Sequence, residues 1–425
     1  MGNRIEAAFA LAAERYTELG VDVEAAMAWA DAVPLSIHCW QGDDVGGFEK
    51  AGASLEGGGI QVTGNYPGKA RTIAELRTDL EQALSLVPGA KRVNLHAIYG
   101  EFGGKKVDRD AIELSHFSGW MDWAKAAGVK LDFNGTFFSH PLAAEGYTLS
   151  HRDPKVRSFW IEHAKRCRAI GAGMGAAQGG PCTVNLWVPD GAKDSPVDRM
   201  GYRKRLIESL DECFAEKFPA GRLEDSVEGK LFGIGSESFV VGSHELYLGY
   251  AATRKIFVTL DMGHYHPTEN VADKISAVLG FVPGVLLHVS RGVRWDSDHV
   301  VTLSDELGEL CRELVRSGEL SPQGGRVRIG LDYFDGSINR VGAWTIGARS
   351  ARKALLAAFL EPRSALLAAD EAGDGFARLA LLEEEKSLPW VAVWDEYCRR
   401  SGAVEEAGFI ASVADYERRV LAARS

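Results

Sequence analysis

The sequence predicts a (β/α)8 barrel, the TIM-barrel form of the α/β class, with helices added at both ends of the chain. Eight runs rich in β-branched and aliphatic residues recur along it, most of them separated by helical patterns, as in a barrel of parallel strands. Polar residues that can do chemistry stand at the end of most of these runs, where barrel enzymes place their active sites. A chain of 425 residues suits a barrel with insertions.

The elements follow from local patterns, taken in order. Charged residues at helical spacing in the first 31 positions predict one or two amphipathic helices, with a break at Gly20. Thr72 and Glu75 form a capping box that opens a helix reaching about residue 87. Further helices are expected over residues 110–127, 154–171 and 199–217. The eight predicted strands cover residues 33–40, 92–99, 130–134, 183–188, 225–228, 255–261, 285–289 and 326–332.

Two segments lie outside this alternation. Residues 42–68 are glycine-rich and too long for a plain connector, so we expect a lid or a subunit contact there. From Asn339 onward the sequence is helical and rich in Ala, Leu, Glu and Arg. We therefore divide the chain into a catalytic barrel over residues 1–338 and a C-terminal helical extension over residues 339–425, which should pack on the barrel or on a neighbouring subunit.

The alternative fold is a doubly wound open sheet, which would need a glycine fingerprint for a dinucleotide. The glycines at 171–175 follow a predicted helix rather than a strand, so we interpret them as a flexible helix end. Gly233 and Gly235 form a lone G-x-G and carry little weight. The barrel is therefore favoured.

Composition excludes several classes of partner. The formal net charge is −11 and no block of Lys or Arg stands out, so neither nucleic acid nor an anionic membrane is expected to bind. The six cysteines are scattered without a C-x-x-C pair, as is typical of reduced thiols in a cytoplasm. No apolar region of a signal peptide and no run of about 18 apolar residues is present, so we expect a cytoplasmic protein.

Candidate functional residues gather at the predicted carboxyl ends of the strands, which share one mouth of a barrel. The strand ends themselves contribute His38, His96, Asn134, Trp187, Glu228, Asp261, His288 and Asp332. Lys230 follows two residues after Glu228. The loop after residues 285–289 adds Asp296 and Asp298, and His264 and His266 follow the strand over residues 255–261.

Five carboxylates at one mouth would repel one another, and some would be driven to protonate. Divalent cations remove that conflict, and with His264 and His288 there are ligands for two ions. Oxygen ligands dominate and cysteine is absent, which favours Mn²⁺, Mg²⁺ or Co²⁺ over structural zinc.

Single residues of this set also have purely structural interpretations. Asp296 and Asp298 could cap the helix expected near residue 304. His38 and His96 could be hydrogen-bonded core residues, and Trp187 could be packing. Asp190 is expected only to complete a Pro-Asp-Gly turn.

With these residues in place, the sequence resembles the L-rhamnose isomerase family over essentially its whole length. The segments that carry the resemblance are residues 38–44, 64–71, 94–99, 230–235, 264–269, 294–299 and 330–335. The resemblance implies a barrel enzyme, usually a homotetramer, that interconverts L-rhamnose and L-rhamnulose. It also implies two divalent metal ions per subunit, Mn²⁺ first, with Co²⁺, Mg²⁺ or Zn²⁺ as alternatives.

The resemblance also assigns roles to residues. It implies one metal bound by Glu228, Asp261, His288 and Asp332, and a second, more loosely held metal bound by His264, Asp296 and Asp298 with water. The choice of His264 over His266 rests on the family motif. The residues expected to line the sugar are His96, Trp187, Lys230 and Asp332.

The reaction implied is a 1,2-hydride shift assisted by the loosely held metal, with Lys230, Asp296 and Asp332 as catalytic residues and Lys230 stabilising charge on O1. Two departures stand out: Gly292 replaces a proline common in the family, which predicts a more mobile loop before Asp296, and residues 134–138 vary. An enediol route is the competing mechanism; it needs a carbon base close to C1 and C2.

Other activities remain open at this stage: isomerisation of another rare aldose, cleavage by a class II aldolase, or sugar binding without catalysis. A metal-dependent hydrolase is disfavoured, because it would want a His-x-His pair at the first strand, where the sequence has Ser36 and His38.

Overall fold

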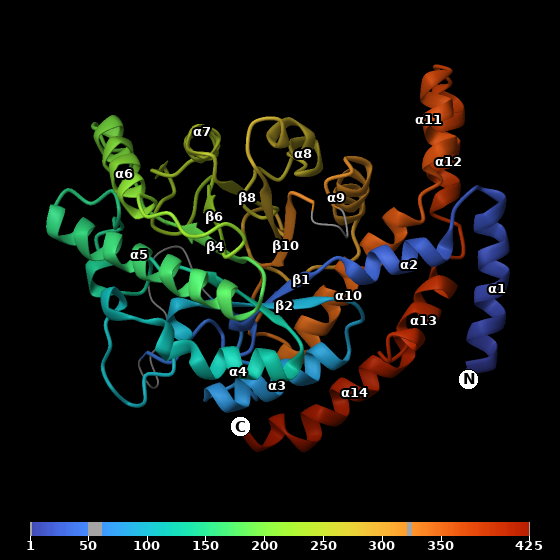
Figure 1. Cartoon of the computed structure of the whole chain (residues 1–425), viewed down its shortest axis with the longest axis horizontal. Coiled ribbons are helices and arrows are strands. Elements are labelled where there is room, and N and C mark those ends of the chain that lie inside the picture. The colour runs from blue at the N-terminus through green and yellow to red at the C-terminus, as the bar shows by residue number, and fades with distance from the viewer. Residues whose placement is uncertain (1, 50–61, 321–324, 425) are drawn as a thin grey trace.

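The structure is a computed structural model that describes residues 2–49, 62–320 and 325–424. Eight parallel strands close into a barrel, in the ring order β1-β10-β9-β8-β6-β4-β3-β2 (Figure 1). The barrel strands are β1 (Leu35–His38), β2 (Lys91–His96), β3 (Lys130–Asn134), β4 (Cys182–Trp187), β6 (Leu223–Glu228), β8 (Phe257–Asp261), β9 (Val285–Val289) and β10 (Val327–Leu331). The predicted (β/α)8 fold is confirmed, with every predicted strand present.

The barrel closes where the first strand meets the last. β10 pairs with β9 over five residues, but with β1 only through Leu35↔Ile329 and Ser36↔Gly330. β1 pairs with β2 over four residues on its other side. The closing seam is therefore the shortest pairing of β10 and joins residues almost 300 positions apart.

A ring of helices covers the strands. It consists of α3 (Ile73–Ser85), α4 (Ser118–Ala127), α5 (Pro154–Ala177), α6 (Arg199–Cys213), α7 (His244–Arg254), α8 (Ala272–Leu279), α9 (Asp305–Arg316) and α10 (Arg340–Phe359). Many begin at a side chain that caps the free backbone N–H groups of the first turn. Thr72 caps α3, and Ser304 caps α9. Asp296 and Asp298 therefore do not cap α9.

Three parts of the sequence interpretation need correction. Helices α7 and α8 were not expected between the strands. The glycines at 171–175 do not end a helix, because α5 continues to Ala177. They let α5 pack closely on the barrel: a Cβ at Gly175 would lie 1.8 Å from the backbone oxygen of Arg222. Six of the eight barrel strands also differ from the predicted bounds by one to three residues at one or both ends.

Asp190 does more than complete a turn. It is buried, and its carboxylate accepts hydrogen bonds from the backbone N–H and the hydroxyl of both Thr148 and Ser150, at 2.6–2.9 Å. It stands next to a small antiparallel sheet of β5 (Gly191–Ala192) and β7 (Phe239–Val240). Asp190 thus anchors the loop after β3 to the loop after β4.

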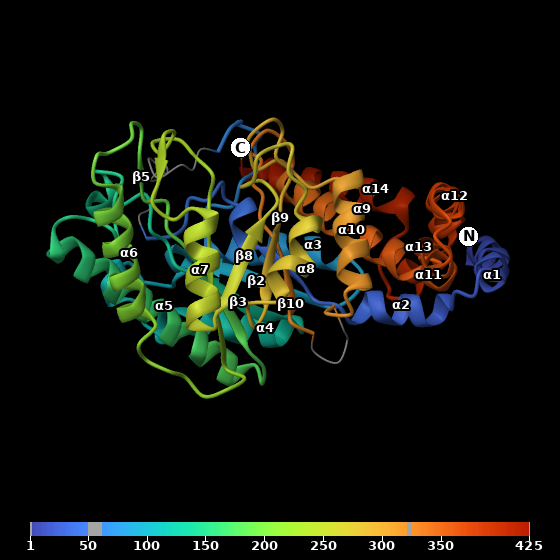
Figure 2. The same cartoon turned by 90° about the horizontal axis from the view of Figure 1, so that it is seen from above.

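The first helices and most of the C-terminal helices lie on one side of the barrel, while α14 (Glu406–Arg419) runs from there back toward the barrel (Figures 1 and 2). This side contains α1 (Gly2–Glu18), α2 (Val23–Ala32), α11 (Arg363–Glu371), α12 (Gly375–Glu385) and α13 (Trp390–Arg400). A separate apolar cluster joins α1, α2 and α13 to the end of α10, with Tyr16, Met27, Leu356 and Trp394 at its centre. The break between α1 and α2 falls at Gly20, as the sequence predicted.

Buried and half-buried charges in the amino-terminal half of the barrel are paired. Arg92 on β2 lies 2.7 Å from Asp132 on β3, which also accepts a hydrogen bond from Ser36. Arg328 on β10 reaches Glu224 on β6, at 2.6 Å. Each carboxylate thus has a guanidinium beside it.

No helix among residues 2–49, 62–320 and 325–424 is long and apolar enough to cross a membrane. The six cysteines are buried free thiols. The expected lid or subunit contact at residues 42–68 lies partly outside the described residues, since 50–61 are not among them.

Candidate metal centre

Four ligand-type side chains meet at the carboxyl ends of the later strands. Glu228 ends β6, Asp261 ends β8, His288 lies near the end of β9, and Asp332 follows β10. One ligand atom from each lies within 4.8 Å of the others. His288 Nδ1 is 3.3 Å from Glu228 Oε1, 3.1 Å from Asp332 Oδ2 and 3.7 Å from Asp261 Oδ2. The structure thus brings together four residues that the sequence placed at one mouth.

The electrostatics of this cluster show an excess of negative charge. Burial raises the pKa of Asp261 to about 7, and repulsion from Glu228 and Asp332 adds to the rise. Burial opposes a charge on His288, but Glu228 and Asp332 outweigh it and hold the imidazole's pKa well above its ordinary value. Both raised pKa values favour protonated side chains at the point where the carboxylates converge.

A divalent cation fits this donor set. Three carboxylate oxygens and an imidazole nitrogen offer mostly hard ligands, which suit Mn²⁺ or Mg²⁺. The carboxylates are also fixed from outside the cluster. Trp40 Nε1 donates to Asp332 at 3.1 Å, and Ser290 Oγ donates to Asp261 at 2.7 Å. Such supporting hydrogen bonds are usual around metal ligands.

A second group of ligand-type residues lies beside the first. His264 Nε2 is 3.4 Å from Asp296 Oδ2, and Lys230 Nζ is 2.7 Å from the same oxygen. Burial opposes the charge on Lys230, but Asp296 and Asp298 raise its pKa above the ordinary value. Burial and the nearby Asp296 raise the pKa of Asp298 well above its usual range. The loop after β9, which carries Asp296 and Asp298, therefore adds two more carboxylates to the mouth of the barrel.

The loop that carries these carboxylates is tied down at both sides. Its base closes through a bridge between Arg291 and His299, and the backbone oxygen of Asp298 accepts a hydrogen bond from the N–H of Phe334. Asp298 has a φ of 47°, a left-handed conformation that side chains other than glycine seldom adopt. Strained backbone of this kind is concentrated at functional sites.

A pocket of about 460 Å³ opens onto both groups of carboxylates. Among the residues that the sequence singled out, His96, Asn134 and Trp187 line it. Burial lowers the pKa of His96 to about 4, so its ring is neutral near pH 7. The Trp187 indole nitrogen is buried without a hydrogen-bond partner among the described residues, and its ring lies 4.8 Å from Lys230 Nζ.

Three further pocket residues were not singled out from the sequence: Trp40, Val45 and Phe334. Trp40 and Phe334 stand directly beyond strand ends, so their position could have drawn attention to them. Val45 has a φ of 58°, which is a rare conformation for a β-branched residue and cannot be inferred from spacing. His38, by contrast, does not line the pocket; it is buried against Tyr333, at 4.4 Å between ring centroids.

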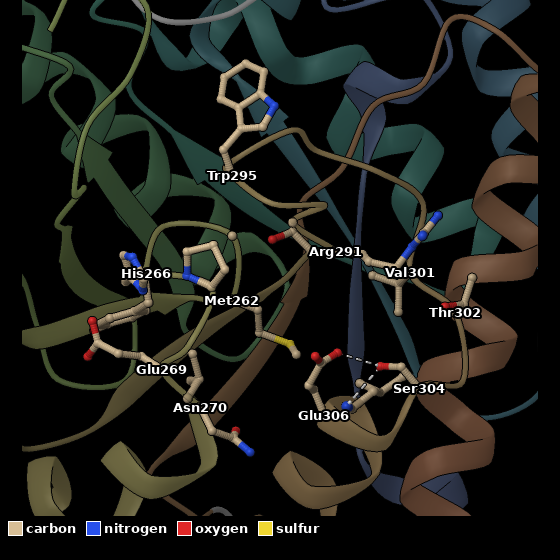
Figure 3. Close-up of a pocket in the computed structure, with 17 residues that line it drawn as sticks. Met262, His266, Glu269, Asn270, Arg291, Trp295, Val301, Thr302, Ser304 and Glu306 are labelled. Atoms are coloured by element: carbon tan, nitrogen blue, oxygen red, sulfur yellow. Dashed lines mark hydrogen bonds between the residues drawn. The ribbon is translucent and has the colours of Figure 1, made fainter. Parts of the chain in front are cut away.

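A larger hollow of about 680 Å³ lies outside the mouth, between the loops after β8 and β9 (Figure 3). His266 lines it together with Glu269 and Asn270, while the indole of Trp295 points away from it (Figure 3). None of the four clustered ligand residues lines this hollow. The structure therefore places His264 at the carboxylates and His266 outside, and the smaller pocket is the candidate active site.

Comparison with known proteins bears on the family of the chain. A family profile described as L-rhamnose isomerase (RhaA) matches residues 3–424. The L-rhamnose isomerase of Rhodopirellula baltica is 58% identical over 421 residues, which cover 99% of this chain and 97% of that protein. The L-rhamnose isomerase of Salmonella paratyphi B is 55% identical over 425 residues, with both chains covered completely.

Among solved structures, that of an L-ribulose 3-epimerase aligns with a TM-score of 0.48 and 12% sequence identity, over 78% of this chain and 95% of that one. The sequence relatives carry the assignment. Because the family profile spans nearly all of the chain and the relatives match it over their full length, this chain belongs to the L-rhamnose isomerase family.

Proposed function

We propose that this chain is a metal-dependent isomerase that converts L-rhamnose into L-rhamnulose and back. The observation that carries the proposal is the cluster of Glu228, Asp261, His288 and Asp332, of which Glu228 and Asp332 line the pocket. Membership of the L-rhamnose isomerase family supplies the reaction and the substrate.

We propose two metal sites. The first is formed by the four clustered residues, and the second by His264, Asp296 and Asp298; Mn²⁺ is the preferred ion by analogy with the family. The crowding of carboxylates and the raised pKa values of Asp261 and Asp298 support this assignment. When bound, the cations supply Lewis acidity that stabilises negative charge on the sugar oxygens.

The reaction moves one hydride and one proton within the sugar. The hydrogen on C2 passes to C1 with its electron pair, so the C1 carbonyl becomes an alcohol and C2 becomes the new carbonyl, while the proton of O2 passes to O1. Lys230 places a buried ammonium beside the pocket, held by Asp296 at 2.7 Å. Its charge stabilises negative charge on O1 in the transition state.

The remaining pocket residues bind and shield the sugar. His96 is neutral, so it can donate a hydrogen bond to a sugar hydroxyl or accept one from it. Trp187, Trp40 and Phe334 form apolar walls that limit the access of water. A hydride shift needs no base at carbon, which agrees with the assignment of the carboxylates near the pocket to metal ligation.

The assembly is also a proposal. We infer a homotetramer in the cytoplasm, in which residues 339–425 form a helical extension that packs on the barrel and on a neighbouring subunit. α10, at the start of this segment, packs between α9 and α3 and completes the helix ring, so subunit contacts fall to the helices after it.

The test uses L-rhamnose deuterated at C2 and protein stripped of metal with a chelator. We expect ketose only after Mn²⁺ is added, with the deuterium retained at C1. Loss of the label to water would instead indicate an enediol route. Two shorter products would indicate an aldolase, and no turnover of L-rhamnose with turnover of another aldose would move the substrate assignment.

A further inference from the structure

A chain of four buried polar side chains runs through the barrel interior below the pocket. Ser226 and Glu228 come from β6, Thr259 from β8 and Asn185 from β4, and none of them is more than 2% exposed. Ser226 Oγ lies 2.6 Å from Thr259 Oγ1, which lies 2.8 Å from Asn185 Oδ1. The Asn185 amide nitrogen donates to Glu228 Oε2. Only Glu228 lines the pocket.

The chemistry of these groups sets the direction of each hydrogen bond. An ionised carboxylate only accepts, so the NH₂ group of Asn185 must face Glu228 and its oxygen must face Thr259. Thr259 then uses its one proton for that oxygen. With that proton committed, Thr259 accepts from Ser226, and every donor in the chain points toward Glu228.

The two oxygens of Glu228 consequently have different surroundings. Oε2 is held by Asn185, whereas Oε1 faces His288 Nδ1 at 3.3 Å and His264 Nδ1 at 3.2 Å. If the Asn185 amide turned over, its oxygen would face a carboxylate oxygen, which is repulsive. The Thr259 hydroxyl holds the amide in its favourable orientation, because it donates to the amide oxygen.

We propose that Thr259 is a positioning residue for the metal centre, acting through Asn185 to fix the carboxylate of Glu228, and that Ser226 supports it. The inference rests on the proposed function, because it assumes that Glu228 binds a metal. Substitution of residues that hold metal ligands typically lowers metal affinity or activity by roughly 10- to 100-fold.

The experiment compares Thr259→Val, which keeps the shape and removes the hydroxyl, with Thr259→Ser, which keeps the hydroxyl. Thr345→Val is the matched control, since Thr345 is equally buried but bonds only within α10, to the backbone oxygen of Val341. Mn²⁺ is titrated by calorimetry into the chelator-stripped full chain, and kcat and KM for L-rhamnose are measured at saturating Mn²⁺.

We expect Thr259→Val to weaken Mn²⁺ binding by about 10-fold and to lower kcat. KM should change little, because Thr259 does not line the pocket. Thr259→Ser and Thr345→Val should bind Mn²⁺ like the parent chain. Ser226→Ala should weaken binding by less than Thr259→Val does, because Ser226 lies one hydrogen bond further from Glu228. This variant decides the question if Thr259→Val fails to fold.

Unchanged Mn²⁺ affinity in folded Thr259→Val would overturn the inference, as would an equal loss in Thr259→Ser or in Thr345→Val. If Thr259→Val does not fold, unchanged affinity in Ser226→Ala would overturn it. Failure of the proposed function looks different: the parent chain itself would then bind no Mn²⁺.

Discussion

The two ends of the barrel differ in whether their negative charges are paired with positive ones. In the amino-terminal half, Asp132 faces Arg92 and Glu224 faces Arg328. At the carboxyl end, five carboxylates converge on two imidazoles and the single ammonium of Lys230. In the amino-terminal half, guanidinium groups of the protein balance the negative charge. At the carboxyl end, the negative charge is balanced only when positive charge is added. Stability and function are therefore separated along one set of strands.

The largest effect should come from Glu228→Gln, which removes a charge from the carboxyl end at constant shape. We expect turnover of L-rhamnose to fall by at least about 10³-fold, since Lewis acid stabilisation is worth several kcal/mol. Melting in chelator should occur at a lower temperature than in the parent chain, because the folded protein stabilises the charged form of Glu228 through His288 and His264 and holds its pKa well below the usual value. Turnover above a tenth of that of the parent chain would contradict the assignment of Glu228.

Arg92→Leu tests the other end. It leaves Asp132 buried without its cation, and such changes cost roughly 3 kcal/mol of unfolding free energy. Denaturant unfolding measures the loss, while Mn²⁺ affinity of the folded protein should stay the same. The exposed Arg71, paired with Glu75, gives the control: Arg71→Leu should change stability little. A weakened Mn²⁺ site in Arg92→Leu would break the separation of the two ends.

Metal addition should stabilise the folded chain through the carboxyl end of the barrel alone. Mn²⁺ at 100 times its dissociation constant should stabilise the folded chain by about 2.7 kcal/mol. Differential scanning calorimetry should show the same gain in Arg92→Leu and none in Glu228→Gln. Equal gains in all three proteins would place the stabilising ion elsewhere.

The smallest effect concerns a half-buried carboxylate in the C-terminal helical extension. Burial raises the pKa of Glu385 on α12 to about 7, with Glu361 adding to the rise. Its stabilising contribution is complete below the unfolded value near 4.5 and is lost as the pH rises through about 7. Glu385→Gln should therefore gain about 1 to 2 kcal/mol relative to the parent above pH 7, after its partial exposure is discounted.

The measurement is urea unfolding from pH 4 to pH 8, which should show a flatter profile for Glu385→Gln than for the parent chain. Turnover should not change, because Glu385 does not line the pocket. A loss of turnover would contradict the separation of Glu385 from the active site.

Sequence periodicity was sufficient for the barrel and for much of the site. The strands over residues 130–134 and 285–289 have the predicted bounds, because both are bounded apolar runs. The clustered ligands were found because strand ends of a parallel barrel must meet. α8 was missed because it has only eight residues, and α7 because a glycine-rich segment precedes it.

The rest depends on tertiary geometry that sequence patterns do not encode. The left-handed backbone of Val45 brings that residue to the pocket wall beside Phe334, almost 290 positions away. The distinction between His264 and His266 rests on the path of one loop. The hydrogen-bond chain through Thr259 exists because three strands carry polar residues that point into the barrel, and their contact depends on the register of β4, β6 and β8.

The short seam between β1 and β10 also has a consequence for the order of synthesis. During synthesis, Glu228, Asp261 and His288 are made before residue 332. β1 has no partner strand on one side until β10 has been made. The complete ligand set arises in the same event that closes the ring. A ribosome-bound fragment that ends before Asp332 should therefore lack the complete ligand set.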